Sequence, residues 1–127
     1  MIVLDTHAWL WRTSKPDLLS GPAREAIEAA DVIGIAPTSC WEVAMLALKG
    51  RIELDRSALV WIQEALFADR VLLLDLTAHI AVLAAELEWE HKDPADRMIV
   101  ATAIVHDAPV VTKDRSIRAF PGVPTIW

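Results

Sequence analysis

The sequence contains a single cysteine, Cys40, so the chain cannot form an internal disulfide. No second thiol and no histidine stand near Cys40 at the spacing of a zinc site, which leaves a small buried thiol as its expected role. The chain also lacks an apolar run long enough to cross a bilayer, and its first residues lack the basic leader of a signal peptide. We therefore expect a cytoplasmic protein with no membrane partner.

Basic residues are also in short supply. Twelve Lys and Arg stand against 18 Asp and Glu, which gives a formal net charge of -6. Broad binding to nucleic acid depends on many Lys and Arg contacts with phosphates. The composition therefore argues against such charge-driven binding, and any contact with nucleic acid must be local.

What the chain does have is an alternation of short aliphatic runs with longer segments of helical spacing. The expected buried strands are 2–4, 32–36, 71–74 and 109–112, with a possible edge strand at 123–127. The expected helices are 22–30, 41–49, 58–68, 78–90 and 95–106. This alternation predicts an α/β fold whose parallel sheet carries helices on both faces and a site at the carboxyl ends of the strands. Because the chain has room for one core and shows no linker or repeat, we expect a single domain over residues 1–127.

Four acidic residues stand where these strands meet helices. Asp5 ends the first strand, Glu42 follows the second, Asp96 opens a late helix and Asp114 follows the fourth strand. If these junctions share one edge of the sheet, their carboxylates meet in a pocket that is costly to assemble without a cation. Mg²⁺ or Mn²⁺ would neutralise the pocket and keep positions open for phosphate oxygens. The pattern predicts metal-dependent phosphodiester hydrolysis, with either one ion or two.

Each of these acids also has an ordinary structural interpretation. An acid at the start of a helix accepts backbone N–H bonds and complements the helix dipole. Ser39 and Glu42 have the spacing of a capping box, and Asp93 before Pro94 is typical of an N-cap followed by proline. Ser, Thr or Asn would cap equally well, so acids at four separate junctions favour metal binding over capping alone.

Four segments of the chain resemble the PIN-domain family, and together they span nearly all of it: Val3-Leu4-Asp5-Thr6, Ser39-Cys40-Trp41-Glu42, Asp93-Pro94-Ala95-Asp96-Arg97 and Thr112-Lys113-Asp114. The late segment, which begins at His91, is similar to the branch of bacterial PIN proteins that includes VapC-like toxins. The resemblance implies a catalytic and metal-binding quartet made of Asp5, Glu42, Asp96 and Asp114. It also implies supporting roles for Thr6, Thr112 and the peripheral acid Asp93.

The same resemblance implies a three-layer α/β/α PIN-like fold with a parallel sheet of about five strands. It further implies Mg²⁺- or Mn²⁺-dependent endoribonuclease activity and a role as the toxin of a type II toxin-antitoxin system. The expected partners are an RNA substrate, a second copy of the chain in a homodimer, and a cognate antitoxin whose tail occupies the active-site groove. DNA would be contacted only indirectly, through the antitoxin.

Contacts with RNA can be assigned to a few further residues. Arg97 and Arg115 stand beside predicted pocket acids and are the expected phosphate contacts, although each could instead balance a neighbouring acid. Six tryptophans are many for this length, and we expect most of them in the core or facing a partner. Trp9 and Trp11, which follow Asp5 closely, are the candidates for stacking on an unpaired base. The four histidines do not repeat at a ligand spacing, so we expect none to bind zinc or act as a general base.

Three other functions remain open at this point. A phosphatase could use Asp5 as a nucleophile, although His7 stands where phosphatases carry a second Asp. A phosphorylated receiver module would also be α/β with acids at the strand edge, but a paired-acid start is missing. The third alternative is a non-catalytic PIN-like module that binds RNA or protein, which failure to bind Mn²⁺ would support.

Overall fold

The computed structural model describes residues 1–127 and contains a five-stranded parallel sheet with the strand order β3-β2-β1-β4-β5. The strands are β1 (Ile2–Leu4), β2 (Ile33–Ile35), β3 (Val71–Leu73), β4 (Val110–Val111) and β5 (Thr125–Ile126). The helices are α1 (Thr6–Ser14), α2 (Gly21–Ala29), α3 (Pro37–Leu48), α4 (Ala58–Leu66), α5 (Ala78–Glu86), α6 (Pro94–Val105) and α7 (Arg115–Ala119), with a 3-10 turn at Pro16–Leu18. The protein therefore has the predicted α/β class and the predicted number of strands.

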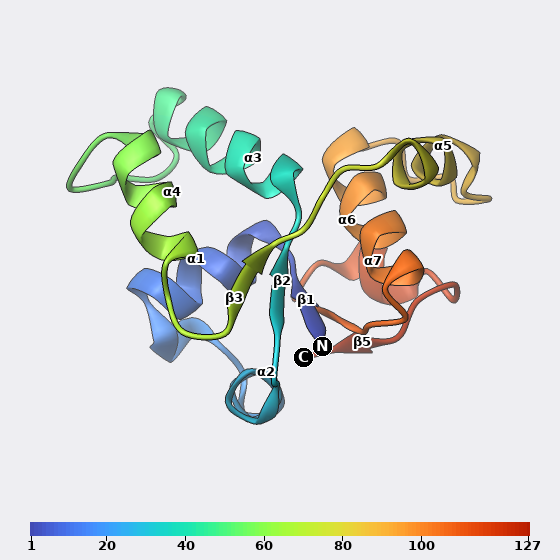
Figure 1. Ribbon diagram of the computed structural model, residues 1–127, viewed down its shortest axis with the longest axis horizontal. Coiled ribbons are helices and arrows are strands. Elements are labelled where there is room, and N and C mark those ends of the chain that lie inside the picture. The colour runs from blue at the N-terminus through green and yellow to red at the C-terminus, as the bar shows by residue number, and fades with distance from the viewer.

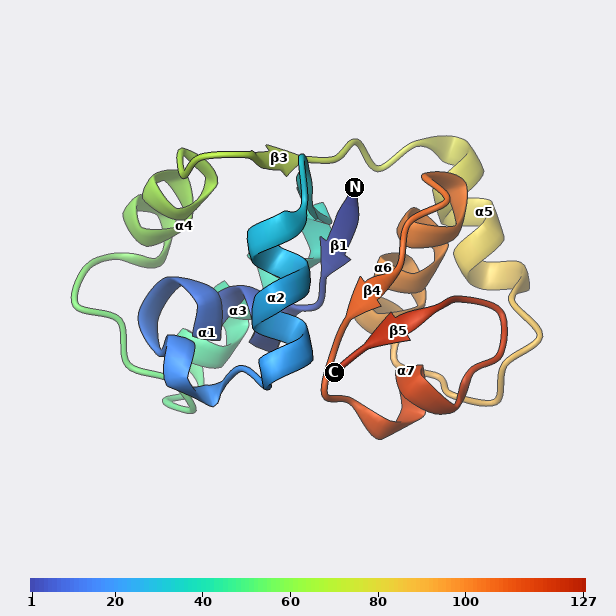
Figure 2. The same ribbon diagram turned by 90° about the horizontal axis from the view of Figure 1, so that it is seen from below.

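Helices cover both faces of the sheet, which gives three layers (Figure 1). Along β1, Ile2 and Leu4 face the first layer, where they pack with apolar residues of α1, α2, α3 and α4. Val3 points to the opposite face and packs with residues of α6 and α7. Because successive side chains of a strand alternate between faces, one short apolar run serves two cores. Figure 2 shows β5 beside β4, with the C-terminus close to the sheet.

Several element boundaries differ from the predictions. Two helices, α1 and α7, lie outside the predicted ranges, although each begins directly after a predicted site acid. Helix α3 begins at Pro37 instead of residue 41, because proline favours the first helical position. The predicted capping box is therefore wrong: Ser39 lies inside the helix and the N-cap is Ala36, which makes no side-chain bond. Helix α5 ends at Glu86, before the predicted residue 90.

Two predicted burials also need correction. The prediction of a buried strand at 71–74 is wrong for Leu72 and Leu73 of β3, which are 49% and 44% exposed because β3 lies at one edge of the sheet. Cys40 is half-buried, and burial raises the pKa of its thiol.

No helix of the structure combines the length and apolar character needed to cross a membrane.

The parallel sheet explains how distant acids are brought together. Strands β1, β2 and β4 are neighbours, and their carboxyl ends lead into α1, α3 and α7 respectively. Helix α6 packs against β1 and α3, which places its first turn at the same edge. In parallel sheets this edge is where ligands bind.

Candidate active site

Asp5 stands at the centre of this edge, between the end of β1 and the start of α1. Its Oδ1 atom accepts a hydrogen bond of 2.8 Å from the Ala8 backbone N–H, which makes it the N-cap of α1. Its Oδ2 atom accepts a short hydrogen bond from the hydroxyl of Thr112, which follows β4. The side chain is buried, so these two contacts fix the carboxylate in one position.

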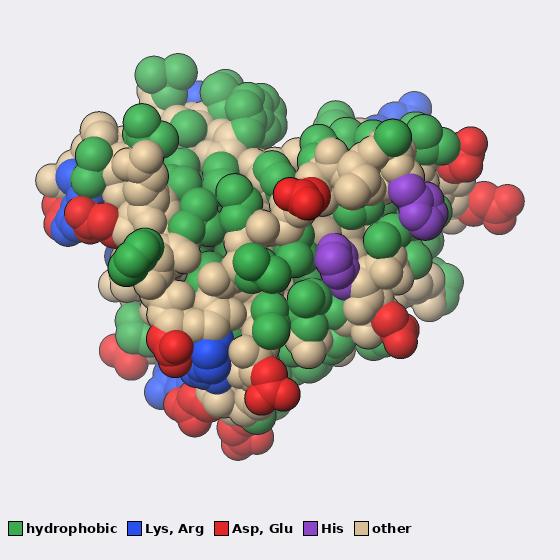
Figure 3. Space-filling view, viewed as in Figure 1, with side chains coloured by type: hydrophobic (Ala, Val, Ile, Leu, Met, Phe, Trp, Pro, Cys, Tyr) green, Lys and Arg blue, Asp and Glu red, His purple; other side chains and the backbone are tan.

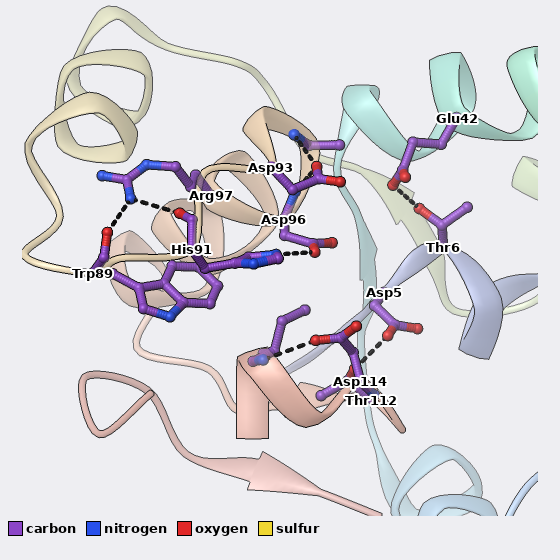
Figure 4. A network of polar contacts seen from close by, with 12 residues as sticks. Asp5, Thr6, Glu42, Trp89, His91, Asp93, Asp96, Arg97, Thr112 and Asp114 are labelled. Atoms are coloured by element: carbon purple, nitrogen blue, oxygen red, sulfur yellow. Dashed lines mark hydrogen bonds and ion pairs between the residues drawn. The ribbon is translucent and has the colours of Figure 1, made fainter. Parts of the chain in front are cut away.

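Glu42 is connected to Asp5 through the next residue of the chain. Thr6, the first residue of α1, donates its hydroxyl proton to Glu42 Oε1 at 2.5 Å. The hydroxyl oxygens of Thr6 and the buried Ser39 lie 3.2 Å apart, which joins α1 to α3. The threonine predicted to support the site therefore contacts a predicted site acid (Figure 4).

The start of α6 contributes Asp93 and Asp96. Asp93 Oδ1 accepts from the backbone N–H groups of Ala95 and Asp96, at 2.9 and 3.2 Å, so the predicted N-cap is confirmed. Asp96 Oδ2 lies 2.7 Å from His91 Nε2. One ligand atom from each of His91, Asp93 and Asp96 lies within 4.8 Å of the other two.

Sequence reasoning missed His91 because only spacings between histidines and cysteines were considered. The informative signal was its spacing to acids: His91 stands two residues before Asp93 and five before Asp96. The irregular segment between α5 and α6 turns its ring back onto the first turn of α6 (Figure 4).

Asp114 follows β4 and caps α7. Its Oδ1 atom accepts from the Ile117 N–H at 2.9 Å, and its own N–H donates to the Thr112 hydroxyl oxygen at 3.0 Å. Thr112 thus connects Asp114 with Asp5. Capping uses a single oxygen of Asp93 and of Asp114, so the second oxygen of each carboxylate stays available. The capping and metal-binding interpretations are therefore compatible at these positions.

The four predicted acids act on one another electrostatically. Burial is the main cause that raises the pKa values of Asp5, Glu42 and Asp96, the last to about 6. Neighbouring carboxylates add to each shift: Asp114 acts on Asp5, Asp93 and Asp5 act on Glu42, and Asp93, Asp114 and Glu42 act on Asp96. The structure therefore brings Asp5, Glu42, Asp96 and Asp114 to one edge of the sheet, with Asp93 among them, and these acids form an acidic cluster (Figure 4).

This cluster predicts that the metal-free protein loses stability as the pH rises. The pKa of Asp96 is about 6 in the folded protein against 3.8 ordinarily, so the folded state binds the proton more tightly between these values. The Asp96 contribution is greatest below pH 4 and is lost as the pH rises through 6, at a cost of about 1–2 kcal/mol after solvent screening. Asp5 and Glu42 shift in the same direction.

Thermal unfolding in EDTA should therefore give a higher Tm at pH 5 than at pH 7. The Asp96→Asn variant removes one of the three titrating groups, so its Tm should depend less on pH. An equal or greater pH dependence in Asp96→Asn would contradict the assignment.

Arg97 has a different role from the predicted phosphate contact. Its guanidinium donates to five backbone carbonyls at 2.7–3.2 Å, those of Ala84, Ala85, Leu87, Trp89 and His91. These bonds use all five N–H groups of the side chain. Arg97 thus secures the C-terminal end of α5 and the segment leading to His91, which corrects its assignment as an RNA contact.

The other residues predicted to contact RNA are Arg115, Trp9 and Trp11, and they differ in their exposure to solvent. Arg115, the first residue of α7, is exposed and has no hydrogen-bond or ion-pair partner in the protein. Trp9 is completely buried and packs edge-on against Trp61, with ring centroids 5.4 Å apart, so it belongs to the core and is no longer a candidate for stacking on RNA. Trp11 is partly exposed.

Comparison with known proteins agrees with this architecture. The PIN domain family model matches residues 2–123. The chain is 40% identical to Ribonuclease VapC22 of Mycobacterium tuberculosis (strain ATCC 25618 / H37Rv) over an alignment of length 129 that covers 99% of this chain and 98% of that protein.

Two solved structures share the fold. VapBC2 from Rickettsia felis, bound to a DNA fragment from its promoter, matches with a TM-score of 0.72 and 18% identity, covering 98% of this chain and 97% of that chain. A toxin-antitoxin complex from Klebsiella pneumoniae matches with a TM-score of 0.69 and 23% identity, covering 97% and 95%. The family match over most of the chain and the 40% identity to a VapC protein confirm the resemblance seen in the sequence, and the chain belongs to the PIN-domain family.

Proposed function

We propose that the protein is a divalent-metal-dependent endoribonuclease and the toxin of a type II toxin-antitoxin pair. The observation that carries this proposal is the convergence of Asp5, Glu42, Asp96 and Asp114 from four separate segments into one acidic cluster. The 40% identity to a protein named as a ribonuclease supports RNA as the substrate. The match to the PIN family over residues 2–123 supports one PIN domain over residues 1–127.

The donor set suits Mg²⁺ or Mn²⁺. Its four carboxylates supply the oxygen ligands that these cations prefer, and their mutual repulsion is the kind that a cation relieves. Asp5, Glu42, Asp96 and Asp114 would hold the metal, with Asp93 at the periphery. A bound divalent cation supplies an activated water and neutralises charge that develops on the phosphate.

The residues around the carboxylates keep them in place before RNA binds. Thr112 and the Ala8 N–H hold Asp5, while Thr6 holds Glu42. His91 holds Asp96 in the same way. In metal sites, residues that hydrogen-bond to the ligating side chains commonly fix the orientation of those side chains. Arg115 is exposed beside Asp114 and is the proposed phosphate contact.

The phosphatase alternative fits this geometry poorly. A nucleophilic carboxylate oxygen must itself reach and bond to phosphorus, whereas a metal ligand needs only a lone pair on an oxygen that also accepts a hydrogen bond. Both oxygens of Asp5 already accept hydrogen bonds, from Ala8 and from Thr112, and the residue is buried.

Protein partners belong to the same proposal. Large apolar side chains are exposed on α3 and at the start of α4: Trp41 is 60% exposed, Leu48 82% and Leu59 64%. Figure 3 shows hydrophobic side chains gathered in this part of the molecule. Exposed apolar surface of this kind marks interaction sites. A homodimer and an antitoxin are the proposed partners, and the two structural relatives described above are toxin-antitoxin assemblies.

Metal dependence is the direct test of this function. We expect purified protein to cleave a mixed RNA pool in Mg²⁺ or Mn²⁺ and to lose this activity in EDTA. Calorimetric titration of the metal-free protein should detect Mn²⁺ binding that tightens as the pH rises from 5 to 7, because protons must leave the acids. In Asp96→Asn the affinity should fall at least about tenfold.

Two results would contradict the proposal in different ways. Undiminished cleavage in EDTA would remove the metal from the reaction. Absence of Mn²⁺ binding would favour the non-catalytic module that binds RNA or protein.

A further inference from the structure

A cavity of about 480 Å³ lies between α1 and the loop that follows α3. His7 and Trp11 of α1 line it on one side, and Arg51 of the loop lines it on the other. A molecule of liquid water takes about 30 Å³, so the cavity has room for a planar ring system. The acidic cluster does not account for this cavity.

The cavity adjoins the acidic cluster through His7. This exposed residue follows Asp5 by two positions on the chain and interacts electrostatically with both Asp5 and Glu42. A strand of RNA whose phosphate lay at the carboxylates would therefore pass the mouth of the cavity with an adjacent nucleotide.

Trp11 is held in place where it borders the cavity. Its ring centroid lies 5.6 Å from that of His7 and 5.6 Å from that of Trp127. The Nζ atom of Lys113 lies 5.9 Å from the ring centroid, so the loop that carries Thr112 and Asp114 also contacts Trp11. Because these neighbours already restrict the ring, Trp11 would lose little side-chain conformational entropy when a base stacks on it.

The charges at the cavity suit an RNA backbone. Lys15 and Arg51 line its wall and are exposed, and their side chains form no ion pair or hydrogen bond within the protein. Glu53 is the one carboxylate among the lining residues. The chain has a net charge of -6, so two cationic side chains without an acidic partner are a local exception. Lys15 and Arg51 lie beside the Trp11 ring and near the acidic cluster, where they can bind RNA phosphates.

We propose that this cavity is a nucleotide-binding subsite, in which Trp11 stacks on an unpaired base of the RNA and Lys15 and Arg51 contact its phosphates. The inference rests on the proposed ribonuclease function and adds a place where single-stranded substrate is held. Base-aromatic stacking is tolerant of sequence, so the subsite selects unpaired RNA over duplex RNA.

Binding can be measured apart from cleavage. In an Asp5→Asn background, Trp11→Ala, Trp11→Phe and Phe67→Ala are compared for binding to a short, unstructured, fluorescein-labelled RNA by anisotropy. Phe67 is the control because it is an aromatic residue, 94% exposed, at the end of α4. Stacking of one base contributes about 1–3 kcal/mol, so Trp11→Ala should weaken binding roughly 5- to 150-fold.

The other variants sharpen the test. Trp11→Phe should retain most of the affinity, and Phe67→Ala should leave it unchanged. Combined Lys15→Gln and Arg51→Gln should reduce the dependence of affinity on salt by about one unit of slope per lost phosphate contact. This pair of surface changes also keeps the test informative if Trp11→Ala lowers the Tm.

Outcomes for the subsite and for the ribonuclease function are distinct. Unchanged RNA affinity in Trp11→Ala, together with an unchanged salt slope in the double variant, would overturn the subsite even if wild type cleaves RNA. A wild type that fails to cleave while Trp11→Ala weakens binding would overturn the ribonuclease function and support the subsite. Equal weakening for duplex and unpaired RNA would overturn stacking as the basis of recognition.

Discussion

Replacing Asp5 with asparagine is expected to slow metal-dependent RNA cleavage by at least about 10²- to 10³-fold. Asp5 is the buried carboxylate at the centre of the sheet edge, and its neighbours hold both of its oxygens. Asparagine keeps the shape and can still accept the Ala8 hydrogen bond, but it lacks the negative charge that a cation needs. Initial cleavage rates in Mn²⁺, at matched protein concentrations, measure the effect.

The control for this experiment is Asp31→Asn. Asp31 is exposed, precedes β2 at the amino end of the sheet, and forms no hydrogen bond or ion pair. The same chemical change there should leave the cleavage rate unaltered. Equal activity in wild type, Asp31→Asn and Asp5→Asn would reveal a contaminating nuclease or a dispensable Asp5.

Stability provides an independent check on Asp5→Asn. Burial raises the pKa of Asp5, which means that its ionised form is unfavourable in the folded protein. The metal-free variant should therefore have a Tm at pH 7 that equals or exceeds that of wild type. A well-folded Asp5→Asn protein with full activity would contradict the proposed site.

Arg97→Met is expected to lower the free energy of unfolding by about 2–4 kcal/mol. Methionine preserves much of the apolar stem of the side chain but removes all five donors. Five carbonyls between Ala84 and His91 would then each lose this hydrogen-bond partner. Urea denaturation of the metal-free protein measures the change.

Arg97→Lys separates charge from geometry. Lysine keeps the positive charge but has three donors on one nitrogen, so it cannot span carbonyls that the planar guanidinium reaches. We expect it to lose most of the same stability. Arg118→Met, a matched change at an exposed residue near the end of α7, should cost little. If Arg97→Met were as stable as Arg118→Met, the five hydrogen bonds would have no structural importance.

The Arg97 variants should also affect the acidic cluster. Arg97 holds the backbone of His91, and the His91 ring contacts Asp96. Loss of such an indirect contact typically lowers metal affinity by about 10- to 100-fold. Titration of the folded variants with Mn²⁺ in the absence of urea measures the loss of metal affinity separately from the loss of stability. Unchanged affinity would confine the role of Arg97 to the fold.

The strands were the most predictable part of the fold. Ile2–Leu4, Ile33–Ile35 and Val110–Val111 are nearly continuous aliphatic runs because a central parallel strand is buried on both faces. Helix boundaries were less predictable. Ser39 looked like an N-cap, yet Pro37 begins the helix. Helix α5 ends at Glu86, where Arg97 binds carbonyls of its last turn and of the segment that follows.

By itself, the sequence determined the fold class and the family. It also predicted that Asp5, Glu42, Asp96 and Asp114 lie at one edge of the sheet. This was possible because strand-to-helix junctions are local features and parallel strands place their carboxyl ends at one edge. Only the tertiary structure decided the individual roles of Arg97, His91, Trp9 and Trp11. A helix turns about 100° per residue, so adjacent positions point in different directions, and what each side chain meets depends on packing that sequence spacing does not encode. Asp96 thus joins the acidic cluster while Arg97 binds carbonyls, and Trp9 enters the core while Trp11 borders a cavity.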